Sequence, residues 1–139
     1  MLAIAIIALT YFLYVSITAP YEAVERQRQI TEDTRARMQQ VRDAMIEHNR
    51  REGRFISTLD SLVMWLKTDS TMVASMDSLF GAGFSPDSLP FSPRTGSMFE
   101  LAVNDTLRTP TYRLDDPDSD DYIGTVTGDV TQLNAASWE

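Results

Sequence analysis

The feature of this sequence that most constrains its fold is an apolar run near the N-terminus. Residues 2–19 contain no charged side chain. A helix over these eighteen residues spans roughly 27 Å at about 1.5 Å per residue, which is close to the hydrocarbon thickness of a bilayer. The run therefore predicts a helix that crosses a membrane or lies in the core of a helical assembly. We assign to this segment Leu2, Ile4, Ile6, Ile7, Leu9, Phe12, Leu13, Val15 and Ile17, with Pro20 at its end.

The surroundings of this run indicate that it is retained. A cleaved signal peptide carries a basic stretch before its apolar part, and no Lys or Arg precedes Leu2. We therefore expect residues 1–20 to form an anchor or a packed helix. Pro20 has no backbone N–H, so we expect it to kink a continuous helix or to mark the exit of the helix from the bilayer. The charges near the segment are balanced in sign and do not indicate its orientation.

Residues 21–53 are expected to form an amphipathic helix. Residues 21–52 contain neither Gly nor Pro, and apolar side chains recur at steps of three and four residues. Such a stripe packs either on the protein's own domain or on neighbouring helices. The helix-packing residues are Ile30, Met38, Val41 and Met45, and the same stripe includes Thr34 and His48, with Val24 and Ala44 widening it.

A tight turn and a second helix follow directly. Gly53 is suited to a helix C-cap, because Gly adopts the left-handed conformation at little cost. Ser57 or Thr58 can serve as the N-cap of a new helix. We expect this short helix to fold back and bury its apolar face near the long one. The residues of the turn and second helix are Gly53, Phe55, Leu59 and Leu62.

The rest of the chain predicts a small mixed head over residues 54–139. Met72, Val73, Met76 and Leu79 are spaced as in a short helix, before several Gly and Pro residues that favour loops. Alternating residues indicate strands over 98–104, 110–116 and 122–128. The expected fold class is α+β, with a long N-terminal helix and a small antiparallel sheet packed on it. The C-terminal Trp138 is expected to be frayed or anchored in a neighbouring molecule.

The helix, turn and second helix together resemble a known family. An apolar N-terminus and a long helix lead into Gly53-Arg54-Phe55, followed by Ser57, Leu59 and Leu62. This pattern over residues 1–67 is similar to the type IV pilins and the type II secretion pseudopilins, in their major pseudopilin branch. It also resembles single-pass proteins of Bacteroidota-type bacteria. Ala5 stands where pilins carry a glutamate in the mature helix.

The resemblance implies a structural role. A pilin-like chain is a subunit of an extracellular or periplasmic filament or of a secretion apparatus. Its apolar helix packs with copies in a filament core or with other pilin-like or membrane subunits, and membrane lipid surrounds it before assembly. The expected location is the bacterial inner membrane, with a single span and a periplasmic or extracellular head, or the cell surface after assembly. The alternative, favoured by Ala5, is a single-pass accessory subunit of a membrane complex.

An acidic segment near the C-terminus is a candidate calcium loop. Asp116, Asp118 and Asp120 alternate like the start of an EF-hand loop. Asp121 occupies the position of the EF-hand glycine and Thr127 that of its final glutamate, so the segment is not an EF-hand. The pseudopilin resemblance implies a calcium ion in a C-terminal loop, whereas the residues alone favour a solvated acidic turn. We expect no other cofactor.

Composition excludes several other functions. The chain has no Cys and one His, so thiolate metal sites and disulfides are excluded and no nucleophile–base set is visible. We therefore expect no enzymatic activity. Residues 55–139 carry thirteen acidic residues against four basic ones, and this charge repels nucleic acid.

Overall fold

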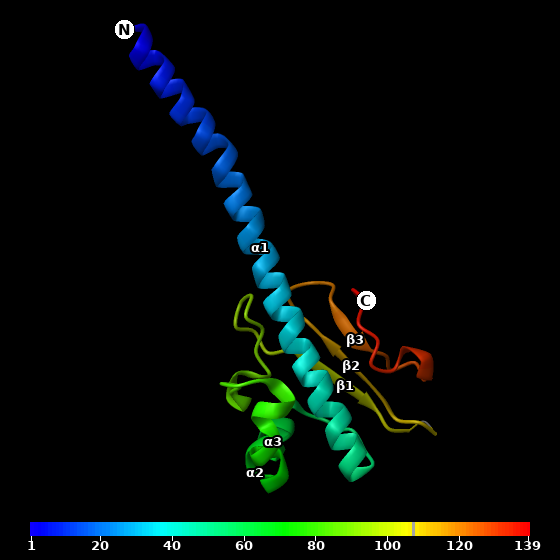
Figure 1. Ribbon diagram of the computed structural model, residues 1–139. Coiled ribbons are helices and arrows are strands. Elements are labelled where there is room, and N and C mark those ends of the chain that lie inside the picture. The colour runs from blue at the N-terminus through cyan, green and yellow to red at the C-terminus, as the bar shows by residue number, and fades with distance from the viewer. Residues whose placement is uncertain (107) are drawn as a thin grey trace. The chain divides into compact units, whose positions relative to one another are not determined.

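The computed structural model describes residues 1–106 and 108–139 and has the expected α+β class. Three helices, α1 (Leu2–Glu52), α2 (Leu59–Thr68) and α3 (Ser70–Phe80), precede three strands, β1 (Glu100–Asn104), β2 (Thr111–Asp115) and β3 (Tyr122–Gly124) (Figure 1). Short 3-10 turns lie at Pro86–Ser88 and Val130–Gln132. The chain divides into two compact units, residues 1–33 and residues 34–139, and we call the second one the head unit. This division falls inside α1, whereas the predicted domain boundaries fall at residues 20 and 53.

Helix α1 is one helix of 51 residues that includes Pro20. Proline removes one backbone hydrogen bond and crowds the preceding turn. Here the helix continues on both sides of that position, so Pro20 does not end it. Farther along, Arg28 lies between Glu25 and Glu32 and forms ion pairs with both at the i, i+3 and i, i+4 spacings that place side chains on one helix face.

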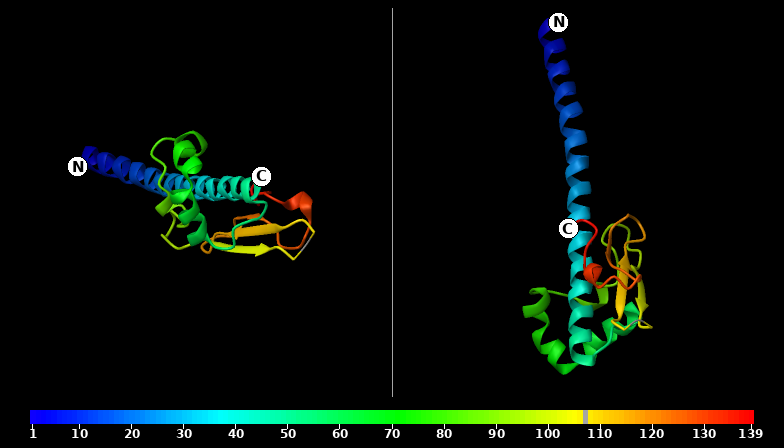
Figure 2. Two further views of the ribbon diagram at one scale, coloured as in Figure 1. Left: turned by 90° about the horizontal axis from the view of Figure 1, so that it is seen from below. Right: turned by 90° about the vertical axis from the view of Figure 1, so that its right-hand side faces the viewer.

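The head unit has a core to which the last third of α1 contributes one face. Met38, Val41, Ala44 and Met45 on α1 are fully buried. In this unit α3 and the sheet lie on opposite sides of residues 34–52 (Figures 1 and 2). The other buried apolar residues come from α2, α3, the loops and the sheet: Phe55, Leu59, Leu62, Leu66, Met72, Leu89, Phe99, Tyr112, Leu114, Ile123 and Ala136.

The turn after α1 and the start of α2 follow the predicted chemistry. Gly53 has a φ of 74°, and its N–H donates to the carbonyl of Asn49 at 2.8 Å, which closes the end of α1. Thr58 is the N-cap of α2, where its side chain accepts a hydrogen bond from the N–H of Ser61 at 3.2 Å. Asp69 then ends α2 and caps α3, since its carboxylate accepts from the N–H groups of Thr71 and Met72.

The sheet is antiparallel, with strand order β1-β2-β3. Leu101 pairs with Leu114, and Arg113 pairs with Gly124. Each strand is shorter than the alternating segment that predicted it, because the pairing with the neighbouring strand ends where the connecting loops begin. The C-terminal tail extends the sheet beyond β3, where Ala136 bridges Ile123.

Candidate functional site

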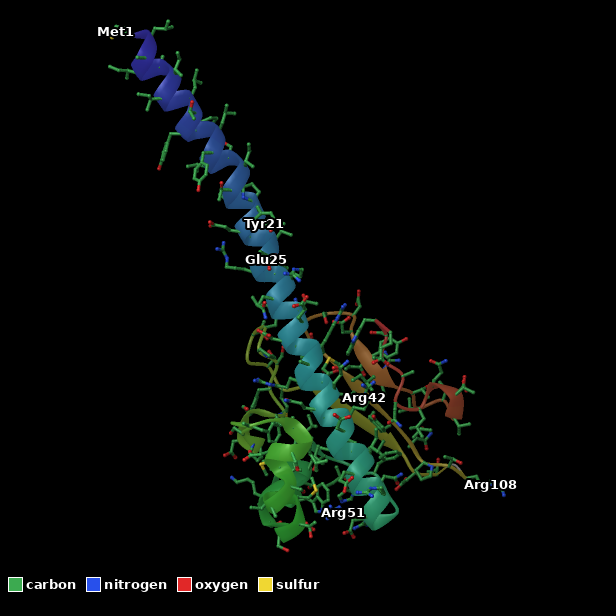
Figure 3. All side chains as sticks on the ribbon, in the orientation of Figure 1. Met1, Tyr21, Glu25, Arg42, Arg51 and Arg108 are labelled. Atoms are coloured by element: carbon green, nitrogen blue, oxygen red, sulfur yellow. The ribbon has the colours of Figure 1, made fainter. Side chains whose placement is uncertain are left out.

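The main candidate site is the apolar segment of α1. This helix is long and apolar enough to cross a membrane, judged by its length and composition, and none of its most apolar eighteen-residue window is buried within the structure. Figure 3 shows the side chains between Met1 and Tyr21 standing out on all sides of the helix. The residues predicted for this segment are all exposed: Leu2, Ile4, Ile6, Ile7, Leu9, Phe12, Leu13, Val15, Ile17 and Pro20.

The predicted helix-packing residues lie in a different environment. Met38, Val41 and Met45 are fully buried in the core of the head unit, and Ile30 is half-buried. Val24, which the sequence pattern adds to the stripe, is exposed. From Met38 onward, this stripe therefore packs on the protein's own domain.

The predicted turn and second helix contribute a compact cluster at the end of α1. Phe55 is buried, and its ring lies 4.8 Å from that of Tyr112 between centroids. Leu59 and Leu62 are buried in the same core, whereas Gly53 is exposed. His48 packs edge-on against Trp65 at 4.9 Å between ring centroids, and its Nδ1 lies 2.8 Å from the carbonyl oxygen of Arg54. His48 therefore helps to fix the turn.

Glu47 joins two arginines at the same end of α1. Its carboxylate accepts hydrogen bonds from Arg50 and Arg51, and its side chain is largely buried. The hydrogen bond from Arg50, followed by that from Arg51, holds the pKa of Glu47 below its ordinary value. These ion pairs stabilise the C-terminal end of α1 and indicate a structural role for Glu47.

The acidic loop uses its carboxylates within the head unit. Asp116 is buried; it accepts hydrogen bonds from the Ser119 hydroxyl at 2.7 Å and from the N–H of Asp118, and Arg94 Nε lies 3.7 Å from it. Asp118 accepts a hydrogen bond from the hydroxyl of Thr95. Asp120 is exposed. Among residues 1–106 and 108–139, no three acidic or His side chains are grouped to hold a metal ion, so calcium binding stays a prediction of the resemblance.

Two arginines of α1 fasten the C-terminal tail, and sequence reasoning missed both. Arg35 forms a two-pronged ion pair with Asp121, with Nε–Oδ2 at 2.9 Å, and its guanidinium lies 5.1 Å from the ring centre of Trp138. Arg42, labelled in Figure 3, donates to the carbonyl of Asn134 at 3.1 Å and pairs with Glu139 at 3.2 Å. These contacts join residues that are far apart in the chain, so no local pattern marks them.

Trp138 has a different place from the one expected. It is half-buried beneath Arg35 and packs against the core of its own head unit. It is therefore neither frayed nor free to anchor in a neighbouring molecule. The reason is the pairing of the tail with β3, in which the N–H of Ser137 donates to the carbonyl of Tyr122 at 2.9 Å and that of Gly124 to the carbonyl of Ala135 at 2.8 Å.

Comparisons with protein-family models, with curated proteins and with solved structures find no match to this chain. The likeness to pilins and pseudopilins therefore rests on the pattern of residues 1–67.

Proposed function

We propose that this protein is a structural subunit of a pilin-like filament or secretion apparatus, in which Leu2–Ala19 packs among other subunits and the head unit faces outward. One observation carries the proposal. The apolar segment is exposed along its whole length, while the same uninterrupted helix supplies buried residues to a separate compact head. Such a helix can join subunits through its apolar N-terminal part while its C-terminal part holds the head unit.

The exposed apolar surface is too costly to remain in water. Burying one Val, Leu, Ile or Phe side chain contributes about 1.5–3 kcal/mol. The nine such side chains from Leu2 to Ile17 therefore represent on the order of 15–25 kcal/mol. This exceeds the usual net stability of a whole domain, about 5–15 kcal/mol. Lipid before assembly, and neighbouring helices after assembly, would shield these apolar side chains from water.

The head unit has the properties of a domain that faces water. Within residues 34–106 and 108–139, fifteen buried apolar residues form one core cluster. Most of the acidic residues of the chain lie in it, and a net negative charge keeps a surface hydrated and soluble. These features support a head on the exported side of a bacterial inner membrane, or on the cell surface once the subunits are assembled.

A second function, an accessory subunit of a membrane complex, is favoured by one residue. Ala5 replaces the glutamate that pilins use within the apolar segment. Without this carboxylate, the apolar segment of residues 2–19 has no charged side chain that could pair with a neighbouring subunit. In the accessory role, the segment would stay in lipid against larger partners and would not polymerise.

Shearing of cells that express the full chain tests the proposal. A filament subunit is released as sedimenting material that contains this chain as its main component. Leu9→Asp is expected to abolish that material, because a charge at this depth costs about 3 kcal/mol in an apolar environment. Val73→Asp, at an exposed position on α3, is the matched control and is expected to leave it intact.

Retention of the wild-type chain in the membrane fraction, at low copy number and bound to other proteins, would contradict the filament role. That result would support the accessory subunit. Tryptophan fluorescence of both variants shows whether the head remains folded, since Trp65 and Trp138 both lie in it.

A further inference from the structure

A cavity of about 340 Å³ lies in the head unit, where the end of α1, the turn after it and the start of α2 meet the loop that follows β1. This volume is at the lower end of the range for small-molecule sites, which is about 300–1,000 Å³. The cavity is therefore large enough for one small organic molecule. Its polar side chains come from all four of these parts of the chain: His48, Arg54, Ser57, Ser61 and Asp105.

His48 brings one unused ring nitrogen to this cavity. The side chain is only 6% exposed, and its Nδ1 lies 2.8 Å from the carbonyl oxygen of Arg54. Because a carbonyl only accepts hydrogen bonds, Nδ1 of the neutral ring carries the proton and Nε2 is an acceptor. Within residues 1–106 and 108–139, no group donates to Nε2. A nearly buried acceptor is disfavoured without a donor, so Nε2 is suited to accept a hydrogen bond from a ligand.

The cavity also carries two opposite charges that do not pair. Arg54 and Asp105 are both exposed, and neither forms an ion pair with the other or with any further residue of the described ranges. Elsewhere in the head unit, Arg35 and Arg42 each contact a carboxylate. A ligand that has one anionic and one cationic group would satisfy Arg54 and Asp105 together.

We propose that this cavity binds a free α-amino acid with an apolar side chain. The guanidinium of Arg54 donates to the carboxylate of the ligand, whose planar shape it matches. The ammonium group of the ligand donates to the carboxylate of Asp105 and to Nε2 of His48. Phe55 and Ile56, which also line the cavity, contact the apolar side chain. This binding function lies in the head unit and does not depend on the structural role of the apolar segment.

Ligands with a single charge suit the same lining less well. A phosphate or another anion would face the carboxylate of Asp105 and the unprotonated nitrogen of His48, and both repel it. An amine or a metal ion would face the positive charge of Arg54. In the part of the chain that the structure describes, no three acidic or His side chains are grouped to hold a metal ion. The mixed charges of the cavity therefore favour a zwitterion.

Calorimetric titration of the full chain in mild detergent with L-leucine tests the proposal. Two matched probes keep the side chain of leucine, and each lacks one of its two charges: 3-methylbutylamine has no carboxylate, and 4-methylpentanoate has no ammonium group. L-Leucine is expected to bind about tenfold more tightly than either probe, because one hydrogen bond to a charged group is worth roughly this factor.

Nuclear magnetic resonance tests the contact with His48 directly. The chain has one His, so labelling with ¹⁵N-histidine reports on the two ring nitrogens of this residue alone. An ammonium group that donates to Nε2 is expected to shift the Nε2 resonance, while Nδ1 keeps its proton and its bond to Arg54. An Nε2 resonance that does not move at saturating L-leucine would contradict this part of the site.

Two variants separate the roles of the charges. Arg54→Gln and Asp105→Asn are each expected to lower the affinity for L-leucine about tenfold. Arg54→Gln is expected to weaken the binding of 4-methylpentanoate but not that of 3-methylbutylamine, and Asp105→Asn the reverse. Arg26→Gln and Asp77→Asn, at exposed positions outside the cavity, are the matched controls and are expected to change nothing.

Three results would overturn the inference: no binding of L-leucine, equal affinity for L-leucine and both probes, or unchanged affinity in Arg54→Gln and Asp105→Asn. These results are distinct from a failure of the structural role. A chain that forms fibres but does not bind L-leucine contradicts the amino-acid site alone. A chain that binds L-leucine but forms no fibres contradicts the filament role alone.

Discussion

Gly124, at the end of β3, occupies a position where the structure leaves no room for a side chain. Its φ is +84°, in the region that only glycine adopts freely. A Cβ built there would lie 2.1 Å from the carbonyl oxygen of Tyr112, a backbone atom. Tyr112 is fully buried and its hydroxyl donates to Asn134 at 2.7 Å. The strand therefore cannot move aside without disturbing the core and the tail.

Gly124→Ala is expected to destabilise the head unit far more than a matched glycine substitution. A left-handed backbone costs a non-glycine residue about 1–2 kcal/mol. Forcing an extra carbon into a packed site costs about 1–3 kcal/mol more. Gly53 has a similar φ of +74° but no atom within 4 Å of its Cβ position. We therefore expect a loss of about 1–2 kcal/mol for Gly53→Ala and roughly 2–5 kcal/mol for Gly124→Ala.

Urea unfolding of the full chain in mild detergent measures this difference. Both tryptophans, Trp65 and Trp138, lie in the head unit, so their fluorescence reports on this unit and not on the apolar segment. The free energies of unfolding follow from the midpoints and slopes of the transitions. Equal losses for the two variants would refute the argument that the contact with the Tyr112 backbone makes Gly124 irreplaceable.

Two further predictions concern ion pairs of the head unit. Arg35→Ala is expected to release the tail, with faster hydrogen exchange at residues 134–139 and a loss of about 1–2 kcal/mol in the free energy of unfolding. Arg26→Ala, at an exposed position of the same helix, is the control. Unchanged exchange in Arg35→Ala would contradict the argument that Arg35 holds the tail in place. The hydrogen bonds from Arg50 and Arg51 lower the pKa of Glu47, so its contribution is complete above its unfolded pKa of about 4.3 and is lost as the pH falls through the lower, folded value. Glu47→Gln is therefore expected to be less stable than the wild type at pH 7 but to lose less stability on acidification; parallel loss in both proteins between pH 6 and pH 3 would contradict this assignment.

The elements that the sequence predicts correctly are those set by local patterns. The three- and four-residue spacing from Thr34 to His48 predicts a helix with one apolar face, and residues from this stripe are buried in the head unit. Gly53 and Thr58 mark the end of one helix and the start of the next, because capping depends on a few neighbouring residues. Alternating residues locate all three strands.

The features that the sequence does not reveal depend on contacts between distant residues. The position of Trp138 depends on the pairing of the tail with β3 and on the contact with Arg35, which lies about a hundred residues earlier in the chain. The need for glycine at position 124 arises from the backbone of another strand. In the acidic loop, five aspartates look alike in sequence, but Asp121 pairs with Arg35 and Asp116 lies against Arg94, and both of these arginines are distant in the chain. Pro20 lies inside α1, which is continuous on both sides of it; the expectation that it kinks the helix or marks the exit of the helix from the bilayer stays a prediction.

The most direct test of the structural role is electron microscopy of the full chain sheared from cells and extracted from its membrane. A filament subunit gives long, uniform fibres in which this chain is the repeating component and the apolar segment lies in the core. Discrete particles that contain this chain at low copy number would contradict the filament role and leave the protein as an accessory membrane subunit.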